Sequence, residues 1–489
     1  MEGMTVRRMT TLTAVVAVLM AAAGAMAAPI VKTGDPAPGS GGRTFTTNFT
    51  DPRINSAGEI AFGARVSGGS NDGVWQTAGG LVVQPALAIE NDPAPGGGTY
   101  SSLSTSAIRL NDLGHVAYRV RVGGSDGYWS NRTGSVQLIV QEGDPAPGSV
   151  PPGNFSNLNA TRIYLNNSDH IAFNDSDLDG VWSESTGSIQ LVAGAGNPSP
   201  PPIGPILNVP MLEYNNNGYC ALVGDHDAPI LNDNSVFSDR SGSLQKVIGA
   251  GDPVPGGGTL TSAMHPVSDI RFNNQNRVAL EAWVEQIISS VQTNRVGIFT
   301  EDAGGTIRLV AKQTVPLPDG NLAADVALLA LDDQGMLFYE GNDSLFVYDT
   351  NTNANTLVLA KGAPAPETTS TFDYFNPAIK TNAMGQLAFR AHLTDGNDGF
   401  WIEQTPGMGD YKLIVLEGQT VEVTPGDFRL IDQIDLNYTQ FFNDAGQYAY
   451  QVDFLDDTEA IYQGLIPEPA TLALLGLGAA GLVARRTRK

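Results

Sequence analysis

The sequence predicts an all-β protein, a β-propeller-like ring of about eight four-stranded blades, flanked by an N-terminal signal peptide and a C-terminal transmembrane sorting helix. Three observations predict this architecture. One unit of about 55 residues occurs eight times, most units contain four apolar strand segments, and both chain ends carry apolar segments beside basic residues. Repeats of this length with four strands each are typical of propeller blades.

The first two strands of each unit flank the pattern Asn-x-x-Gly-x-x-Ala-Phe, as at Asn55–Phe62. The first position is Asn in seven units and Asp in one, and the fourth is Gly, Asp or Asn. These residue types accept a left-handed backbone or fold their side chains onto a turn, so the pattern predicts a tight hairpin. The first positions are Asn55, Asn111, Asn166, Asn215, Asn273, Asp332, Asn382 and Asn443. Because the unit around Asp332 is the most divergent, a seven-bladed ring is the alternative.

The third strand of each unit carries an aromatic residue in a recurring position, as in Gly180-Val181-Trp182. Four tryptophans share it, namely Trp75, Trp129, Trp182 and Trp401. Such recurrence favours core packing between blades over ligand stacking. A fourth strand and a proline-rich link, such as Gly143-Asp144-Pro145-Ala146-Pro147-Gly148, complete the unit.

The two ends of the repeat array predict how the ring closes. The eighth unit stops after its third strand, at Ile461-Tyr462, whereas the mature chain begins with a lone strand around Ile30–Lys32 and a link. We expect that N-terminal strand to pair with the last blade. Closure of this kind removes an exposed sheet edge.

The N-terminal segment, residues 1–27, has the features of a secretory signal peptide. Arg7 and Arg8 precede an apolar run, and Ala25-Met26-Ala27 provides small residues for cleavage. The predicted propeller domain then covers residues 28–466.

The C-terminal segment, residues 467–489, has the features of a sorting signal. It begins Pro467-Glu468-Pro469, continues with the uncharged run 470–484, and ends in a basic cluster that includes Arg485 and Arg486. That run would extend roughly 22 Å as a helix, short for a membrane span but sufficient with thinning or snorkelling. The basic end is expected to stay cytoplasmic, which places the propeller outside.

This tail resembles the PEP-CTERM signal of bacteria that make extracellular polysaccharide. The resemblance implies processing by an exosortase-type membrane enzyme near Pro467-Glu468-Pro469, with a permanent membrane anchor as the alternative outcome. Residues 30–465 also resemble the NxxGxxAF tandem repeats of bacterial surface proteins. That second resemblance implies no catalytic residues.

Composition limits the partners of the exported part. Without residues 1–27 and 470–489, the chain has 50 acidic and 21 basic residues, a net charge near −29. Nucleic acid is therefore an unfavourable partner, because phosphate binding needs the opposite charge. Cations and neutral glycans remain compatible. Cys220 stands alone, so no intramolecular disulfide forms, and it is expected to pack as a small buried hydrophobe.

Sites for chemistry are few in this sequence. Asp175, Asp177, Asp179 and Gly180 match the start of an EF-hand loop, but Thr186 stands where the closing Glu belongs. Calcium is thus the one cofactor considered, and the alternative is a solvated acidic turn. The histidines lack metal-ligand spacing, and His115, just after a hairpin turn, is expected to be simply exposed. We identify no catalytic residues.

The sequence thus predicts an exported protein of the cell surface or exopolysaccharide matrix, a non-catalytic scaffold or binder rather than an enzyme. One alternative is a glycan-active hydrolase or lyase, since propellers place carboxylates around a central channel and two can act as acid and base. The other is a calcium-dependent adhesin. An enzyme should break the repeat pattern at the channel mouth, whereas a scaffold should show the same turns all round.

Overall fold

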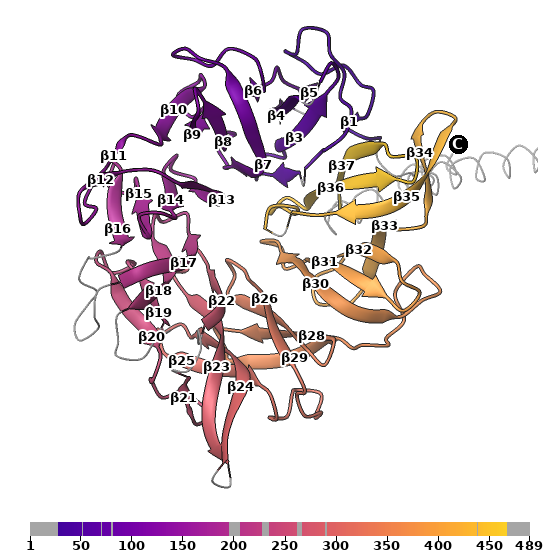
Figure 1. The fold of residues 1–489 in the computed structure, drawn as a ribbon. Helices are drawn as coiled ribbons and strands as arrows, with labels where there is room; N and C mark the ends of the chain where they lie inside the picture. Colours follow the sequence, from indigo (N-terminus) through magenta and orange to yellow (C-terminus); the bar gives the residue numbers. More distant parts are fainter. Residues whose placement is uncertain are drawn as a thin grey trace, which may run out of the picture.

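The computed structural model describes residues 28–466, except 51, 70, 80–81, 195–205, 227–233, 262–266, 289–290 and 438. All regular secondary structure in these ranges is β-strand, arranged as eight blade sheets around a ring with one further two-stranded pair in a link (Figure 1). None of the residues described belongs to an apolar helix of membrane-spanning length. The eight-bladed β-propeller prediction is confirmed for this part of the chain.

The first four blades follow one another in chain order. Blade 1 contains β2 (Arg53–Ile54), β3 (Ile60–Val66), β4 (Asn71–Ala78), β5 (Val82–Val83) and β6 (Ala88–Ile89). Blade 2 contains β7 (Tyr100–Leu110), β8 (Val116–Val122), β9 (Ser125–Ser130) and β10 (Gln137–Gln141). Blade 3 contains β13 (Leu158–Leu165), β14 (Ile171–Asp175), β15 (Gly180–Ser183) and β16 (Gln190–Gly194). Blade 4 contains β17 (Ile206–Tyr214), β18 (Cys220–His226), β19 (Asn234–Ser238) and β20 (Gln245–Gly249).

The other four blades repeat the pattern. Blade 5 contains β21 (Thr259–Leu260), β22 (Val267–Phe272), β23 (Val278–Ile288), β24 (Val291–Glu301) and β25 (Ile307–Lys312). Blade 6 contains β26 (Val326–Leu331), β27 (Met336–Gly341), β28 (Ser344–Asp349) and β29 (Ala354–Leu359). Blade 7 contains β30 (Phe372–Thr381), β31 (Leu387–Leu393), β32 (Asp398–Glu403) and β33 (Tyr411–Leu416). Blade 8 contains β34 (Thr420–Thr424), β35 (Asp427–Asp435), β36 (Gln447–Phe454), β37 (Glu459–Leu465) and β1 (Val31–Lys32).

Each blade is an antiparallel meander whose first long strand lies toward the centre of the ring (Figure 1). A short additional pair, β11 (Pro145–Ala146) and β12 (Gly153–Asn154), lies in the link between blades 2 and 3. The divergent sixth unit forms a complete four-stranded blade, β26 to β29. The seven-bladed alternative is therefore wrong.

The ring closes through its N-terminal strand, as predicted. In β1, Val31 lies opposite Ile461 and Lys32 opposite Ala460, so β1 supplies the outer strand of blade 8. Backbone bonds extend the pairing, with the Ile30 N–H 2.8 Å from the Ile461 carbonyl oxygen. Residues from the two chain ends thus form one sheet, and the edge of β37 is covered.

The Gly-x-Trp motif of the third strand has a steric cause. The indole ring folds back over the glycine two positions earlier, so a Cβ atom at Gly180 would lie 2.6 Å from the Trp182 ring. A Cβ atom at Gly73 would lie 2.5 Å from Trp75. Only glycine leaves room for the ring.

The tryptophans also fasten the proline-rich links. Trp182 is fully buried, and its indole N–H donates to the Pro147 carbonyl oxygen at 2.9 Å. Trp182 shares a core cluster with Tyr128 of the preceding blade. Trp75 and Trp401 make the same indole bond to the preceding link. Their predicted packing role is confirmed, and prolines of the links provide the carbonyl acceptors.

Candidate functional site

The hairpin turns between first and second strands form a belt of buried polar side chains at one end of the ring. We call this the hairpin belt, and it consists of the first turn residues Asn55, Asn111, Asn166, Asn215, Asn273, Asp332, Asn382 and Asn443. All eight are at most 9% exposed. In each, side-chain Oδ1 accepts the backbone N–H groups two and four residues later. This arrangement closes the turn from within.

The belt also joins neighbouring blades. The Asn111 Nδ2 group donates to the Asn166 carbonyl oxygen at 3.0 Å, and Asn273 donates to that of Asp332 at 2.8 Å. Two further blade pairs, starting at Asn55 and Asn215, repeat this bond. The same bond links blades 8 and 1, where the ring closes, because Asn443 donates to the Asn55 carbonyl oxygen at 2.8 Å. An ionised aspartate has no N–H group to donate in this way. Asparagine is therefore needed both to close the turn and to bond the next blade.

In five blades the side-chain amide also donates to an acceptor in one of two places. In blades 1, 7 and 8 the acceptor is the residue after the turn glycine, for example Glu59 at 2.9 Å from Asn55. In blades 2 and 4 the fourth turn residue of the next blade supplies it, and Asn111 Nδ2 lies 2.7 Å from Asp169 Oδ1. The matching acceptor for Asn215 is Asn276, also at 2.7 Å. The acceptor thus comes either from the residue after the turn glycine or from the fourth turn residue of the next blade, so the residue types at these two positions are related.

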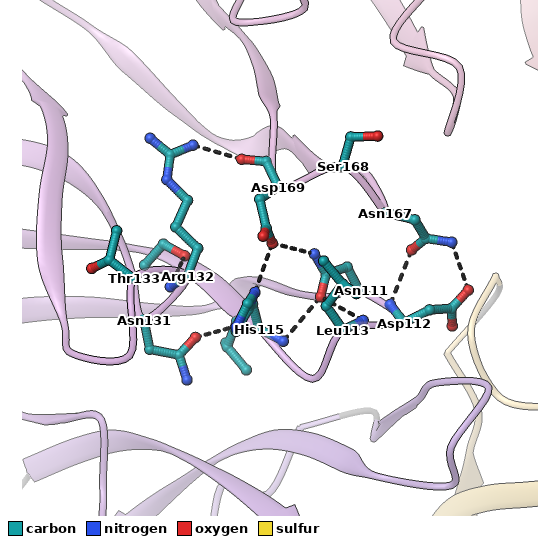
Figure 2. Close-up of polar contacts among 12 residues, drawn as sticks. Asn111, Asp112, Leu113, His115, Asn131, Arg132, Thr133, Asn167, Ser168 and Asp169 are labelled. Atoms are coloured by element: carbon teal, nitrogen blue, oxygen red, sulfur yellow. Dashed lines mark hydrogen bonds and ion pairs between the residues drawn. The ribbon is translucent and has the colours of Figure 1, made fainter. Parts of the chain in front are cut away.

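Figure 2 shows this arrangement between blades 2 and 3. His115 Nδ1 lies 2.7 Å from Asp169 Oδ1, and its side chain is only 27% exposed. The prediction that exposure alone explains His115 is therefore wrong, because an interblade partner was missed. Arg132 caps the same turn by donating to the Asp169 carbonyl oxygen at 2.6 Å and to Glu184 at 2.5 Å. Blades 4 and 5 repeat this Arg–Glu pair with Arg240 and Glu301, which marks the group as structural.

A different set of side chains lies two residues before the belt. We call it the axial ring, and it consists of Arg53, Arg109, Tyr164, Glu213, Arg271, Ala330 and Lys380 on the first strands of blades 1 to 7. The residues immediately preceding them, such as Ile108, Ile163 and Leu212, are buried. Since side chains alternate along a strand, the axial ring points to the opposite face, and its members are only half-buried. In blade 8 the corresponding Phe441 is buried.

Four axial-ring residues, Arg109, Tyr164, Glu213 and Arg271, are linked electrostatically. The pKa of Glu213 responds to the charges of Arg271 and Arg109, and that of Tyr164 responds to Glu213, Arg109 and Arg271. Their strands β7, β13, β17 and β22 belong to four successive blades. The Arg109 guanidinium carbon also lies 5.9 Å from the centre of the Tyr164 ring.

Burial dominates the electrostatics of this cluster. It raises the pKa of Glu213 to about 7, although Arg271 and Arg109 oppose the shift. It also raises the pKa of Tyr164, so the phenol stays protonated. Arg271 is held by the Leu329 carbonyl oxygen at 3.2 Å and by Asp269 at 2.5 Å. The cluster therefore contains several hydrogen-bond donors, and the pKa of its Glu213 carboxyl group is raised to about 7.

The acidic loops of the opposite face are largely neutralised. Asp126 receives Arg119 at 2.6 Å and Arg121 at 2.7 Å. Blades 1 and 7 repeat the pairing, with Arg65 at 2.8 Å from Asp72 and Arg390 at 2.6 Å from Asp398. Three of the acidic loops that suggested a charged face thus contain structural ion pairs.

The proposed calcium residues lie in the turn between β14 and β15. Asp175 is buried, and its two carboxylate oxygens accept four backbone N–H groups, from Ser156, Asn157, Asp177 and Leu178. This carboxylate therefore closes a loop. Within the described ranges, no three His, Cys, Asp or Glu side chains form a group suited to a metal ion. Asp177 and Asp179 lie in the same turn, and Asp177 accepts from the Asn157 side-chain amide at 3.0 Å.

The predicted sorting residues Pro467, Glu468, Pro469, Arg485 and Arg486 lie outside the described residues. The predicted cleavage residues Ala25 and Ala27 also lie outside them. The last described residue, Ile466, donates its N–H to the Gly446 carbonyl oxygen at 2.9 Å, so the chain leaves the ring at the hairpin belt of blade 8.

Sequence reasoning missed both the interblade bonds of the belt and the axial ring. A usable signal existed for the axial ring. Aligning the eight turns shows that the position two residues earlier is basic in four units and differs in the others. The interblade bonds had a weaker signal in the Glu or Gln that follows some turn glycines.

Comparison with solved structures yields weak likenesses. An oligogalacturonate lyase in complex with manganese is 10% identical, covering 79% of this chain and 100% of its own, with a TM-score of 0.39. Prolyl oligopeptidase B from Galerina marginata is 10% identical over 85% of this chain and 55% of its own, with a TM-score of 0.40. Neither carries information on activity here. No curated protein sequence matches the chain significantly.

Two sequence families match. The PEP-CTERM protein-sorting motif covers residues 465–489, which implies an exported protein that an exosortase recognises and that is anchored to the cell envelope through its C-terminal tail. A family of unknown function, DUF7453, matches residues 4–176, 174–343 and 334–473. These three matches together span nearly the whole chain, so the protein is a member of the DUF7453 family with a PEP-CTERM tail.

Proposed function

We propose that this protein is an exported component of the cell surface or exopolysaccharide matrix and acts there as a non-catalytic scaffold or binder. The sorting motif supports the location. The observation that carries the non-catalytic part is the hairpin belt, whose buried amides are occupied by their own turns and by the next blade. A belt of this kind repeats the same structural contacts around the ring and leaves no distinctive reactive group among its described turn residues.

We further propose that residues 1–27 form a signal peptide cleaved after Ala27, and that residues 470–484 insert into the cytoplasmic membrane. An exosortase-type enzyme would then cut near Pro467-Glu468-Pro469. The position of Ile466 supports this, since a cut there leaves every propeller strand intact. Intact mass of the extracellular protein tests it. A mass that includes residues 470–489 would instead make the tail a permanent anchor.

A glycan-active enzyme is the second candidate. Glu213 favours it, because burial raises its pKa to about 7, a value suited to a general acid, and Tyr164 and Arg109 share its environment. A partner carboxylate for acid and base work would have to be Asp269, which is engaged by Arg271. A calcium-dependent adhesin using Asp175, Asp177 and Asp179 is the third candidate.

A glycan array probed with the exported protein, with and without calcium, tests these proposals together. Binding without turnover, unchanged by a chelator, is expected for the scaffold or binder. Release of shortened or unsaturated sugars would establish the enzyme and overturn the first proposal. Binding that a chelator abolishes would favour the adhesin.

A further inference from the structure

Blade 7 departs from the repeat at two neighbouring positions of its first and second strands. In blade 2, Arg121 pairs with the third-strand aspartate at 2.7 Å and lies opposite Ser101. In blade 7 the equivalent aspartate is Asp398, and His392 takes the place of the arginine, with its Nδ1 atom 2.6 Å from Asp398 Oδ1. Tyr374 lies opposite His392, where blade 2 has the serine. An imidazole and a phenol ring thus stand where blade 2 has a guanidinium group and a small hydroxyl.

The framework around these two positions is the same in both blades. A second arginine holds the aspartate at 2.6 Å, Arg119 in blade 2 and Arg390 in blade 7. The residue after the fourth strand accepts the backbone N–H of that aspartate, Glu142 at 2.9 Å and Glu417 at 2.7 Å. Since the same framework forms around either pair of side chains, folding of the blade does not by itself require a tyrosine and a histidine.

The two rings form an exposed aromatic pair. Their centres lie 4.6 Å apart and their planes meet at 24°, so Tyr374 stacks on His392. Tyr374 is 39% exposed and the His392 side chain is 24% exposed. In the part of the chain that the structure describes, Phe428 is the other exposed aromatic residue. Because the belt turn precedes β31 and His392 lies near the end of that strand, the pair faces away from the end of the ring where Ile466 leaves it.

Asp398 fixes the orientation of the imidazole. A carboxylate can only accept, so Nδ1 of the neutral ring carries the hydrogen and Nε2 carries the lone pair. No described residue hydrogen-bonds His392 Nε2. The pair therefore combines an exposed aromatic ring with a nearby hydrogen-bond acceptor of fixed orientation. A sugar ring has a matching surface, with C–H groups on one face and hydroxyl donors at its edge.

The charges beside the pair favour a neutral ligand over an anionic one. Asp373 adjoins the tyrosine in sequence, and Asp435 lies 3.7 Å from Arg390. The two cations here are themselves engaged, because Arg390 also binds Asp398 at 2.6 Å and Lys361 lies 3.2 Å from Asp373. Three carboxylates thus accompany two cations, in a chain whose exported part has a net charge near −29. An anionic sugar would meet repulsion of like charges.

We infer that Tyr374 and His392 form a binding subsite for a neutral hexose unit of a glycan. The apolar face of the sugar packs on the Tyr374 ring, and one of its hydroxyl groups donates to His392 Nε2. Asp398 is a positioning residue, since it acts through the imidazole. This inference rests on the proposed function and names the ligand class of the binder.

A glycan array probed with the full-length protein in detergent tests the subsite. The probes are cellohexaose and mannohexaose, which are neutral, and hexagalacturonate, which is acidic. We expect binding to a neutral hexaose and none to hexagalacturonate. Tyr374→Ala should weaken binding at least about tenfold, because the stacking surface is lost, whereas Tyr374→Phe keeps the ring and should stay within about twofold. His392→Ala should weaken binding about fivefold through loss of one hydrogen bond.

Phe428→Ala is the matched control, since Phe428 is an aromatic residue of blade 8 that is 64% exposed. It should leave binding unchanged. Retained binding by Tyr374→Phe separates loss of the ring from loss of the fold. Neutral-glycan binding that survives Tyr374→Ala, or that Phe428→Ala abolishes instead, overturns the subsite while the binder function stands. A preference for hexagalacturonate overturns the neutral class, and absence of binding to all three probes overturns both this inference and the proposed glycan binder.

Discussion

The axial ring lies near the ends of the first strands and the hairpin belt lies two residues later, in the turns, yet the two sets of side chains behave in opposite ways. The belt holds one residue type in seven of eight blades, and each of its amides bonds its own turn and, in five blades, the next one. The axial ring holds five residue types in seven blades. The belt position, which joins the blades, is nearly the same in all units, whereas the axial position two residues earlier varies.

The contrast between the uniform belt and the variable axial ring separates structural positions from positions free to vary in this propeller. Belt side chains are buried, and their hydrogen bonds go to their own turns and, in five blades, to the next blade. Axial side chains need only be anchored, and they can differ from blade to blade without loosening the ring. Variation between blades is therefore concentrated two residues before the first turn residue, not at that residue itself.

Loss of the closing strand should give the largest effect, because it opens the belt at the Asn443–Asn55 link. Deleting residues 28–34 removes β1 and exposes the edge of β37. The burial of Val31 is lost with it, so we expect a decrease of about 2–4 kcal/mol in the free energy of unfolding, with aggregation. Chemical denaturation and light scattering measure this. An unchanged unfolding midpoint would show that β1 is dispensable for closure.

The ring itself was predictable because its causes are local and repeated. Eight turn motifs, the Gly-x-Trp strand and the incomplete units at the two ends each have a direct chain signature, and together they predict eight blades and β1 as the closing strand. The divergent turn at Asp332 raised a seven-bladed alternative. It failed because strands β26 to β29 keep their apolar pattern, and a complete blade needs that pattern more than the turn residue.

The candidate site was much less predictable, since it depends on contacts between blades. The bond of His115 to Asp169, some 54 residues later, has no local signature. The same is true of Asp175, which resembles a calcium ligand in sequence but accepts backbone N–H groups in the folded chain. Which strand residues point to the axis also follows from the ring geometry, which a linear pattern does not contain.

Comparing two neighbouring substitutions would test the contrast directly. Asn273→Ala removes a buried donor to the Asp332 carbonyl oxygen and the acceptor of two turn N–H groups. We expect it to lower the free energy of unfolding by about 2–4 kcal/mol. Arg271→Gln, two residues away and partly exposed, should cost under about 1 kcal/mol. Equal losses, measured by urea denaturation, would contradict the separation of roles.

The one carboxylate in the belt should make stability depend on pH. Burial raises the pKa of Asp332 to about 7, so the folded state holds its proton more tightly than the unfolded state. Its contribution is therefore fully favourable below about pH 4 and is lost as pH rises through 7. Asp332→Asn should remove this dependence and stabilise the protein by about 2–4 kcal/mol at pH 8. A wild-type minus variant difference that stays constant from pH 4 to 8 would refute it.

The smallest effect concerns the two alternative acceptors in the belt. In blade 2, Asp169 of the next blade accepts from Asn111, whereas in blades 1, 7 and 8 a Glu or Gln after the turn glycine does so. The His115→Gln/Asp169→Gly double variant should therefore convert blade 2 to the second arrangement. The single change Asp169→Gly removes the acceptor but also relieves a positive φ of 63°, so that variant alone mixes two opposing effects. A double-mutant cycle isolates the coupling, because the backbone effect cancels. We expect the His115→Gln change to stabilise the Asp169→Gly background by about 1 kcal/mol more than the wild-type background, in urea denaturation. Zero coupling would mean that the two acceptors are not interchangeable and that their pairing across the repeats is accidental.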